Sequence, residues 1–317
     1  MAGSKTTLAQ PSLGPMPAAG KRGLITRPHR LSMLDRYFTL SAVAPTLLIM
    51  LIVFGLPLLF SAYLSLHGWS ANQGIFDGPY VGLANYDDLL HDPGFLRSLW
   101  ITLLYTAVMV AAQLGLGLAM ALALNVDLPL IGFFRTVLII PMMLTPIVAA
   151  LTWRLLLDPS HGIINYLLGT NIVWLADPVL AFLSVGVVNI WQNAPYVAVI
   201  LLAGLRSIPS ESLEAASIDG ANRLQKFWYI VLPLLQPYLM VALLIRTIFE
   251  FRSFDNVYVM TNGGPADATM LLSIFTYMVS FVQFDMSYGA AASWLMLAIS
   301  LLLCLFFVVM IRRRRMG

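Results

Sequence analysis

Residues 288–311 read YGAAASWLMLAISLLLCLFFVVMI without one charged side chain, and the run Arg312–Arg315 follows directly. A helix needs about 20 consecutive apolar residues to cross the hydrocarbon layer of a membrane. A basic cluster beside such a run is typical of its cytoplasmic end. Residues 288–311 are therefore predicted to cross a membrane as a helix whose carboxyl end faces the cytoplasm.

Five further stretches are as apolar as this one. Together they give six predicted spans: Thr39–Leu64, Leu99–Leu124, Gly132–Leu157, Pro178–Leu205, Leu234–Phe254 and Tyr288–Ile311. A seventh stretch, Met270–Phe284, is interrupted by polar residues and is predicted to be a short interfacial or re-entrant segment. The alternating segments of about ten residues that build membrane barrels are not seen, so the fold class is predicted to be an all-α integral membrane protein.

The composition of the whole chain points the same way. Of the 317 residues, 59% are hydrophobic and only 10% are charged, and the mean hydropathy is +0.83. Such a chain has too little polar surface for a water-exposed globule, so it is expected to lie in membrane lipid. A net charge of +3 does not indicate a nucleic-acid partner, and one cysteine with four scattered histidines predicts no metal site.

The basic residues predict the orientation. With the N-terminus in the cytoplasm, 14 of the 18 Lys and Arg residues lie on the cytoplasmic side, in agreement with the positive-inside rule. Both termini are then cytoplasmic. Residues 1–38 form a polar, basic tail without apolar periodicity, which is predicted to be disordered. Residues 39–64 are the first transmembrane helix.

A longer polar loop, residues 206–236, separates the fourth and fifth spans. A helix is predicted from about Glu211 to Ile218, where Asp219-Gly220 ends it. Small residues at 215, 216, 220 and 221 would let another protein approach the backbone closely, and Glu214 and Asp219 could make charge-assisted contacts. The residues alone leave a second interpretation open, in which the loop helix merely covers the ends of its own bundle.

The loop resembles the EAA motif of type I ABC importer permeases. The matching residues are Glu214, Ala215, Ala216, Asp219, Gly220, Ala221, Phe227, Ile230, Leu232, Pro233 and Pro237. The resemblance implies that this segment is the coupling helix, which docks into a cleft on an ATP-hydrolysing subunit. It also implies the type I fold, with residues 95–311 as the permease core.

Two further stretches resemble the carbohydrate branch of that family, which includes maltose-type and glycerol-3-phosphate-type permeases. They are residues 81–86, VGLANY, and residues 254–265, FDNVYVMTNGGP. The resemblance implies that the cargo is a sugar, an oligosaccharide or a related polyol or glycerol phosphate. Gly263, Gly264 and Pro265 are expected to contact a solute-binding protein, although they could simply form a tight turn.

Polar side chains also occur at membrane depth. Asn189, Gln192, Asn193 and Tyr196 share one face of the fourth predicted span, and they could line the path of a sugar. Hydrogen bonding between helices is the alternative. Arg246 and Glu250, spaced i, i+4, are interpreted as a structural ion pair.

The expected function is that of a non-catalytic permease subunit in the cytoplasmic, or inner, membrane of a prokaryote. The chain has no G-x-x-x-x-G-K-[ST] pattern, so ATP-Mg is expected on two separate ATP-binding cassette subunits. The resemblance implies a second, homologous but different permease chain and an extracytoplasmic solute-binding protein. A secondary transporter of a small polar solute is the alternative, and it would show paired broken helices and internal repeats. An intramembrane enzyme is disfavoured, because no catalytic residue set or metal-binding H-E-x-x-H occurs.

Overall fold

The computed structural model describes residues 33–69, 74, 77–126 and 129–316, with backbone alone at residues 33–40 and 313–316. These ranges are helical and contain no β-strand, apart from one isolated bridge between His67 and Tyr80. Within them, five helices are long and apolar enough to cross a membrane, or six when one bent helix pair counts as a span. The predicted all-α membrane fold is confirmed.

The chain divides into two compact units, Met1–Leu56 and Pro57–Gly317. In the first, α1 (Met33–Met50) leads into a π-helical turn, Leu51–Gly55. The next helix, α2 (Leu56–Ser65), begins at the last residue of this unit and otherwise belongs to the second. Residues 1–32 of the predicted tail, residues 1–38, lie outside the described residues. Residues 33–38 are helical, so the tail is shorter than predicted. The helix begins at Met33 rather than Thr39, and the stretch before Thr39 contains Met, Leu and Arg, which favour helix.

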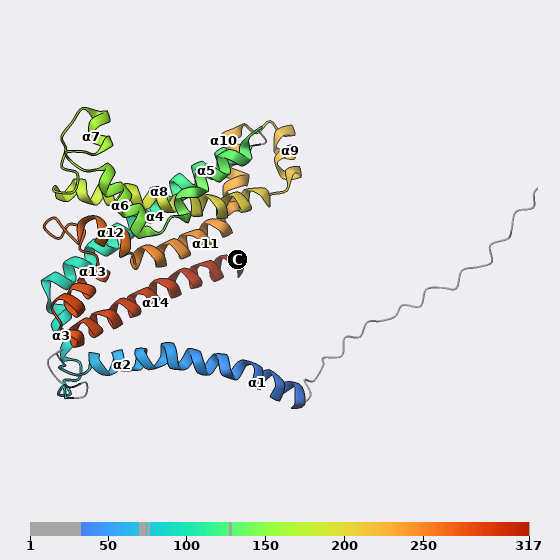
Figure 1. Ribbon diagram of the computed structural model, residues 1–317. Helices are drawn as coiled ribbons and strands as arrows, with labels where there is room; N and C mark the ends of the chain where they lie inside the picture. The colour runs from blue at the N-terminus through green and yellow to red at the C-terminus, as the bar shows by residue number, and fades with distance from the viewer. Residues whose placement is uncertain (1–32, 70–73, 75–76, 127–128, 317) are drawn as a thin grey trace, which may run out of the picture. The chain divides into compact units, whose positions relative to one another are not determined.

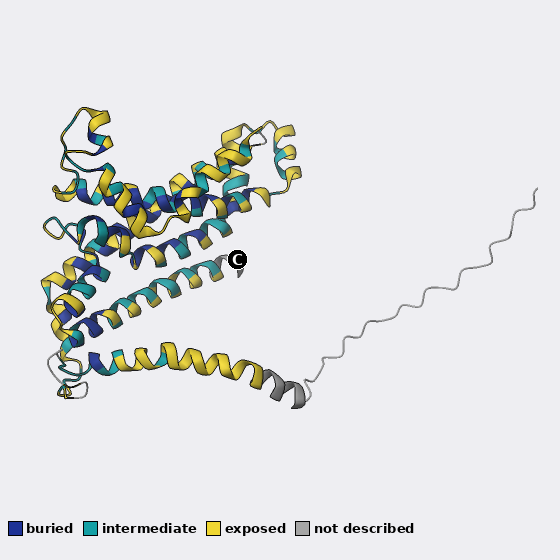
Figure 2. Cartoon of the chain, viewed as in Figure 1, coloured by how far each residue is buried: buried dark blue, intermediate teal, exposed yellow. Residues whose placement is uncertain are grey.

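The second unit is built on four long helices: α4 (Pro93–Leu124), α8 (Pro178–Arg206), α11 (Leu232–Phe251) and α14 (Met286–Met316). The helices α4, α8 and α11 pack against one another, and α14 packs on α11 (Figure 1). Buried side chains concentrate where α4, α8 and α11 meet (Figure 2). The backbones approach closely at Gly117, where an added Cβ would lie 2.6 Å from Cγ1 of Val197.

Two of these helices begin with an aspartate followed by a proline. Asp92 Oδ1 accepts a hydrogen bond from the Gly94 amide at 2.7 Å, and Asp177 Oδ1 accepts from the amides of Val179 and Leu180 at 2.9 Å. These N-caps satisfy amides that have no partner inside the helix, and the proline lacks an amide that would need one. The cap also explains why α4 starts at Pro93, ahead of the apolar run predicted from Leu99.

The third predicted span, Gly132–Leu157, is not one straight helix. It consists of α5 (Ile131–Met143) and α6 (Pro146–Leu156), bent by 97°. Pro146 forces Thr145 into extended backbone, with φ −65° and ψ 142°. The break therefore follows from the proline. The continuous apolar run predicts a single span here, because hydropathy does not register the effect of a proline on the backbone.

The remaining elements are short. They are α3 (Ala84–His91), α7 (Ile163–Leu168), α9 (Ser210–Ile218), α10 (Arg223–Lys226), α12 (Asp255–Thr261) and α13 (Leu272–Tyr277), with π-helical turns at Phe227–Val231 and Met278–Val282. The stretch predicted not to cross the membrane, Met270–Phe284, contains α13 and the second of these turns, which together are shorter than a span. In Figure 1, α9 and α10 lie at one end of α8, and α6, α7 and α12 lie towards the other.

Candidate functional site

The helix predicted in the polar loop is present as α9. It ends in a Schellman motif, in which Gly220 has φ +80° and its amide donates to the Ser217 carbonyl at 3.2 Å. The amide of Ala221 donates to the Ala216 carbonyl at 2.9 Å. This end needs a left-handed residue, and glycine adopts that conformation without strain.

The next turn is capped as well. Asn222 and Gln225 form a capping box at the start of α10, with two hydrogen bonds of 2.8 Å. Lys226 Nζ also donates to Ser217 Oγ, which ties α10 to α9. The loop is therefore a defined helical hairpin rather than an irregular connection.

This hairpin exposes much of its surface. No residue of α9 is buried; Glu214, Ala215, Asp219 and Gly220 are exposed, whereas Ala216, Ala221 and Phe227 are half-buried and Pro233 is exposed at the start of α11. Apolar side chains are exposed beside them, with Ile218 at 88%. Exposed apolar surface next to charged residues is typical of a protein-binding site.

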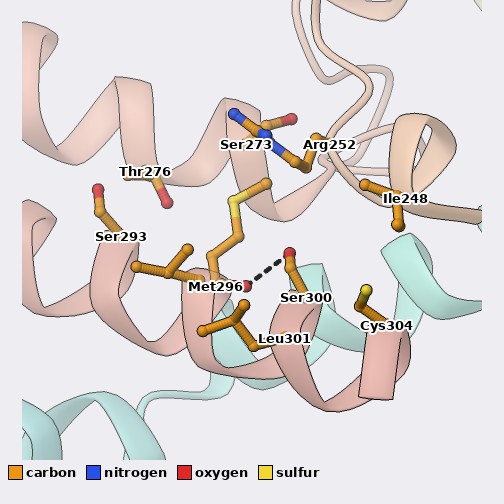
Figure 3. Close-up of a pocket in the computed structure, with 10 residues that line it drawn as sticks. Ile248, Arg252, Ser273, Thr276, Ser293, Met296, Ser300, Leu301 and Cys304 are labelled. Atoms are coloured by element: carbon orange, nitrogen blue, oxygen red, sulfur yellow. Dashed lines mark hydrogen bonds between the residues drawn. The ribbon is translucent and has the colours of Figure 1, made fainter. Parts of the chain in front are cut away.

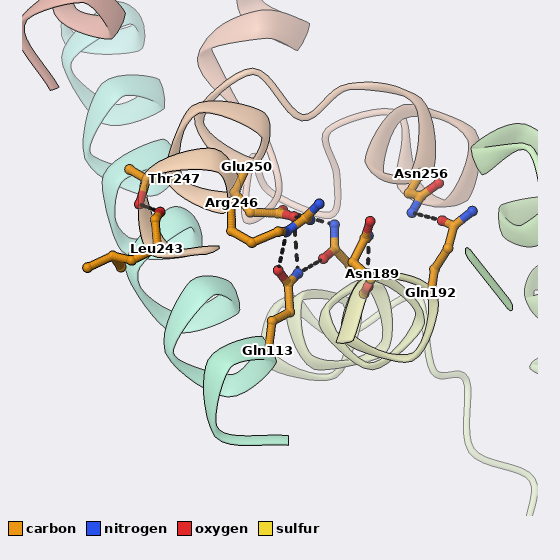
Figure 4. Close-up of polar contacts among 9 residues, drawn as sticks. Gln113, Asn189, Gln192, Leu243, Arg246, Thr247, Glu250 and Asn256 are labelled. Atoms are coloured by element: carbon orange, nitrogen blue, oxygen red, sulfur yellow. Dashed lines mark hydrogen bonds and ion pairs between the residues drawn. The ribbon is translucent and has the colours of Figure 1, made fainter. Parts of the chain in front are cut away.

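A buried polar network joins the three central helices (Figure 4). Gln113 on α4 donates to Asn189 Oδ1 at 2.5 Å and to Glu250 Oε1 at 3.0 Å, and Asn189 on α8 donates to Glu250 Oε2 at 3.0 Å. Arg246 forms an ion pair with Glu250 and donates from Nε to Gln113 Oε1 at 2.8 Å. All four residues are buried, so the network holds α4, α8 and α11 together.

A second set of hydrogen bonds reaches the break between α5 and α6. Gln192 donates from Nε2 to the Leu144 carbonyl at 2.8 Å, and Asn256 on α12 donates from Nδ2 to Gln192 Oε1 at 2.9 Å. A carbonyl can only accept a hydrogen bond, so Leu144 fixes the orientation of the Gln192 amide. Asn256 is oriented in turn, which links the helix break to α8 and α12.

The second set, and all of the first except Gln113, border a cavity of about 280 Å³. Its lining residues come from the helix break, α8, α11 and α12: Met142, Leu144, Pro146, Asn189, Gln192, Asn193, Arg246, Phe249, Glu250, Arg252, Ser253, Phe254, Asp255 and Asn256. Of the four residues predicted to line the path of a sugar, three line this cavity, and Tyr196 does not. The two interpretations of this stripe coexist, because Asn189 and Gln192 line the cavity and also bond to neighbouring helices.

Sequence reasoning missed Gln113 and Asn256. Gln113 carries a signal that could have been used, since it is the single amide side chain in the apolar run 99–124. An isolated amide at membrane depth needs a partner on another helix. Asn256 has no such signal, because its position beside Gln192 depends on how α12 folds back.

A larger cavity, of about 560 Å³, lies between α11, α13 and α14 (Figure 3). Its hydroxyl groups already donate to backbone carbonyls: Ser273 to Ser253, Thr276 to Leu272, Ser293 to Gly289 and Ser300 to Met296. Each of these hydroxyls has a single hydrogen, so none is left to donate to a ligand, and Arg252 is the remaining strong donor in the lining. The smaller cavity is therefore the better candidate for a polar solute.

The predicted contact residues Gly263, Gly264 and Pro265 form a tight turn after α12. Gly263 is buried with φ +88°, and an added Cβ would lie 2.7 Å from Met270 Cε. Arg97 on α4 holds the turn by donating to the Ala266 carbonyl at 2.7 Å. Gly264 and Pro265 are half-buried, and the neighbours Ala266 and Asp267 are more exposed.

Comparison with known proteins identifies relatives along most of the chain. Residues 113–315 match the family model described as binding-protein-dependent transport system inner membrane component. The probable ABC transporter permease protein y4oQ of Sinorhizobium fredii is 40% identical over 263 residues, which cover 82% of this chain and 84% of the relative. The trehalose/maltose transport system permease protein MalF of Thermococcus litoralis is 36% identical over 239 residues, or 74% and 80% of the two chains.

Other relatives carry different cargo names. The sn-glycerol-3-phosphate transport system permease protein UgpA of Agrobacterium fabrum is 34% identical over 255 residues, 75% of this chain and 86% of that one. Among solved structures, a chain of a bacterial alginate ABC transporter, in complex with an alginate-bound periplasmic protein, matches with a TM-score of 0.78. It is 21% identical and the match covers 89% of this chain and 96% of that chain, so it shows a shared fold.

Proposed function

The chain belongs to the family of binding-protein-dependent transport system inner membrane components, the permeases of ABC importers, and on this premise we propose that it forms half of the translocation path of an ATP-driven carbohydrate importer. The observation that carries the proposal is the exposed hairpin of α9 and α10 between the fourth and fifth spans. A self-sufficient carrier has no need of such a structure.

The hairpin is the coupling element. Glu214 and Asp219 make charge-assisted contacts with an ATP-binding subunit, and Ala215, Ala216, Gly220 and Ala221 allow its surface to approach the backbone. Phe227 and Pro233, where the hairpin joins α11, transmit the movement to the spans. Two ATP-binding cassette subunits bind ATP-Mg and hydrolyse it, and this chain contributes no catalytic group.

The cavity beside the buried network lies on the path of the cargo. Asn193 offers its Oδ1 to a sugar hydroxyl, and Asn189 and Gln192 each retain a second amide hydrogen and a second oxygen lone pair beyond their bonds within the protein. Phe249 and Phe254 offer rings to sugar C–H faces. Tyr196 lies two turns beyond Asn189 on the same face of α8 and contributes where the path continues. A second, different permease chain supplies the other half of the path.

The two ends of the unit have different partners. The turn at Gly263, Gly264 and Pro265 contacts an extracytoplasmic solute-binding protein, while the hairpin and both termini are cytoplasmic. The arrangement in Figure 1 supports this assignment, because α12 and α9 lie towards opposite ends of α8. The clustering of Arg and Lys in the chain termini also supports it, through the positive-inside rule.

Co-purification tests the proposal. The tagged chain is isolated from its native membrane as the wild type, as Glu214→Lys and as Glu211→Lys, a matched charge reversal on the same exposed helix. Wild type and Glu211→Lys are expected to recover ATP-binding subunits and a second permease, whereas Glu214→Lys loses the ATP-binding subunits.

The opposite result would favour a secondary transporter of a small polar solute. The chain would then purify alone and transport when reconstituted alone. Such carriers use paired broken helices, and the part of the chain that the structure describes contains one bent pair, α5 and α6.

A further inference from the structure

The charges that line the smaller cavity cancel. They are two cations, Arg246 and Arg252, and two anions, Glu250 and Asp255. We infer that the cargo is an uncharged carbohydrate, an inference that rests on the proposed function and narrows its substrate class. The cargo names of the relatives do not decide this, because they include trehalose and maltose as well as the anionic sn-glycerol-3-phosphate.

The first charge pair is closed to an ionic cargo. The side chains of Arg246 and Glu250 are only 7% and 2% exposed. Both carboxylate oxygens of Glu250 already accept hydrogen bonds, from Gln113 and Arg246 on one and from Asn189 on the other. Arg246 Nε is taken by Gln113. An anion that bound Arg246 would compete with Glu250 for the guanidinium. Separating a buried ion pair leaves an uncompensated charge, which is strongly unfavourable.

The second pair is open but balanced. Arg252 and Asp255 are exposed and lie three residues apart, where α11 ends and α12 begins. An anion drawn to Arg252 would meet the carboxylate of Asp255 in the same lining. The charges of Arg252 and Asp255 cancel in the lining without a direct ion pair between them, so this half of the path offers an anion no net positive charge. A charge that leaves water without a counter-charge meets a large desolvation penalty.

The other lining groups suit hydroxyls and C–H faces. Asn193 is half-buried and donates from Nδ2 to the Asn189 carbonyl at 2.9 Å, which leaves its Oδ1 to accept a hydrogen bond from a hydroxyl. Phe249 is 65% exposed, and Phe254 is held in place by stacking on Tyr258 at 4.9 Å between ring centroids. Amide and aromatic groups without net charge are the chemistry that recognises a neutral sugar.

Uptake from two carbohydrate pools tests the inference. The complex isolated through this chain, with its ATP-binding subunits, second permease and solute-binding protein, is placed in proteoliposomes. A plant-cell-wall and storage-carbohydrate hydrolysate is separated by anion exchange into an uncharged and an acidic pool, and mass spectrometry identifies what ATP drives into the lumen. We expect uptake from the uncharged pool to exceed uptake from the acidic pool by about tenfold or more, given the penalty for an uncompensated charge.

The outcomes separate the two proposals. Comparable or faster uptake from the acidic pool would overturn the inference and leave the importer function intact. Uptake from neither pool would overturn the carbohydrate importer itself.

A matched pair of variants connects the result to this cavity. Asn193→Lys and Asn193→Met remove the same amide and are similar in size, but the lysine adds an uncompensated cation. We expect uptake of the uncharged pool to be about tenfold lower for Asn193→Lys than for Asn193→Met, because an ammonium group in the lining retains its water in the cavity. Equal uptake by the two variants, both recovered as assembled complexes, would show that the charge balance of the lining does not matter.

Discussion

Asn189 on α8 donates a hydrogen bond of 3.0 Å to Glu250 on α11, and the same carboxylate is held by Gln113 on α4. One carboxylate thus joins three membrane helices at the edge of the candidate cargo cavity. Separating these helices inside the membrane would leave the buried carboxylate without hydrogen-bond partners, which is costly. The three helices are therefore expected to move as one body when the cavity changes its access.

Removing this carboxylate is the first test of the network. Glu250→Leu leaves Arg246 buried without its counter-charge, and loss of one partner from a buried ion pair costs about 3–5 kcal/mol. The free energy of unfolding, measured by detergent titration, is expected to fall by an amount in that range. The double variant Arg246→Met with Glu250→Leu removes both charges and is expected to be more stable than the single variant. A double variant as unstable as the single one would contradict the assignment of the loss to an unpaired charge.

Two glycines of α4 should respond in opposite directions to the same substitution. At Gly117 an added Cβ would lie 2.6 Å from Val197 Cγ1 and 3.1 Å from the Ala194 carbonyl oxygen, whereas at Gly115 nothing lies within 4 Å. Gly117→Ala is expected to lower the free energy of unfolding by about 1–3 kcal/mol through overpacking. Gly115→Ala is expected to raise it by up to about 1 kcal/mol, because alanine has the higher helix propensity. Losses of equal size at both positions would refute the close contact between α4 and α8.

The spans could be predicted from the sequence because burial in lipid imposes one simple condition, a long apolar run. Tyr288–Ile311, for example, meets this condition without any contribution from the rest of the fold. The hairpin could be predicted as well, since Gly220 and the small residues before it act locally. The bend at Pro146 was recognisable in principle but was hidden in an apolar stretch. The meeting of Gln113 with Glu250 could not be predicted, because residues 137 positions apart are brought together only by helix packing.

The loop after α6 carries a carboxyl group with an altered acidity. The backbone amides of His161 and Ser160 donate to Asp158 Oδ1 at 2.8 and 2.9 Å, and they hold the pKa of Asp158 below its usual value. A depressed pKa means that the folded loop gains stability above the ordinary aspartate pKa of about 3.9 and loses it as the pH falls through the lower folded value. Carboxyl NMR of Asp158 should therefore give a midpoint below that of an unfolded aspartate. A midpoint at or above the unfolded value would show that the two amides do not hold the carboxylate in solution.

The Schellman motif that ends α9 can be tested by substituting its glycine, Gly220. Gly220 has φ +80° and no neighbour within 4 Å of an added Cβ, so Gly220→Ala introduces backbone strain of about 1–2 kcal/mol and no clash. Gly169, at the end of α7, is a matched control, since it has φ +63° and equally open surroundings. Both variants are expected to lose similar stability locally, but only Gly220→Ala should speed hydrogen exchange of the Ala221 amide, which is bonded to the Ala216 carbonyl. If α9 is the coupling element, Gly220→Ala should also recover fewer ATP-binding subunits in co-purification, whereas Gly169→Ala should recover as many as the wild type. Equal recovery with both variants, despite faster exchange at Ala221, would mean that the shape of this helix end does not contribute to coupling.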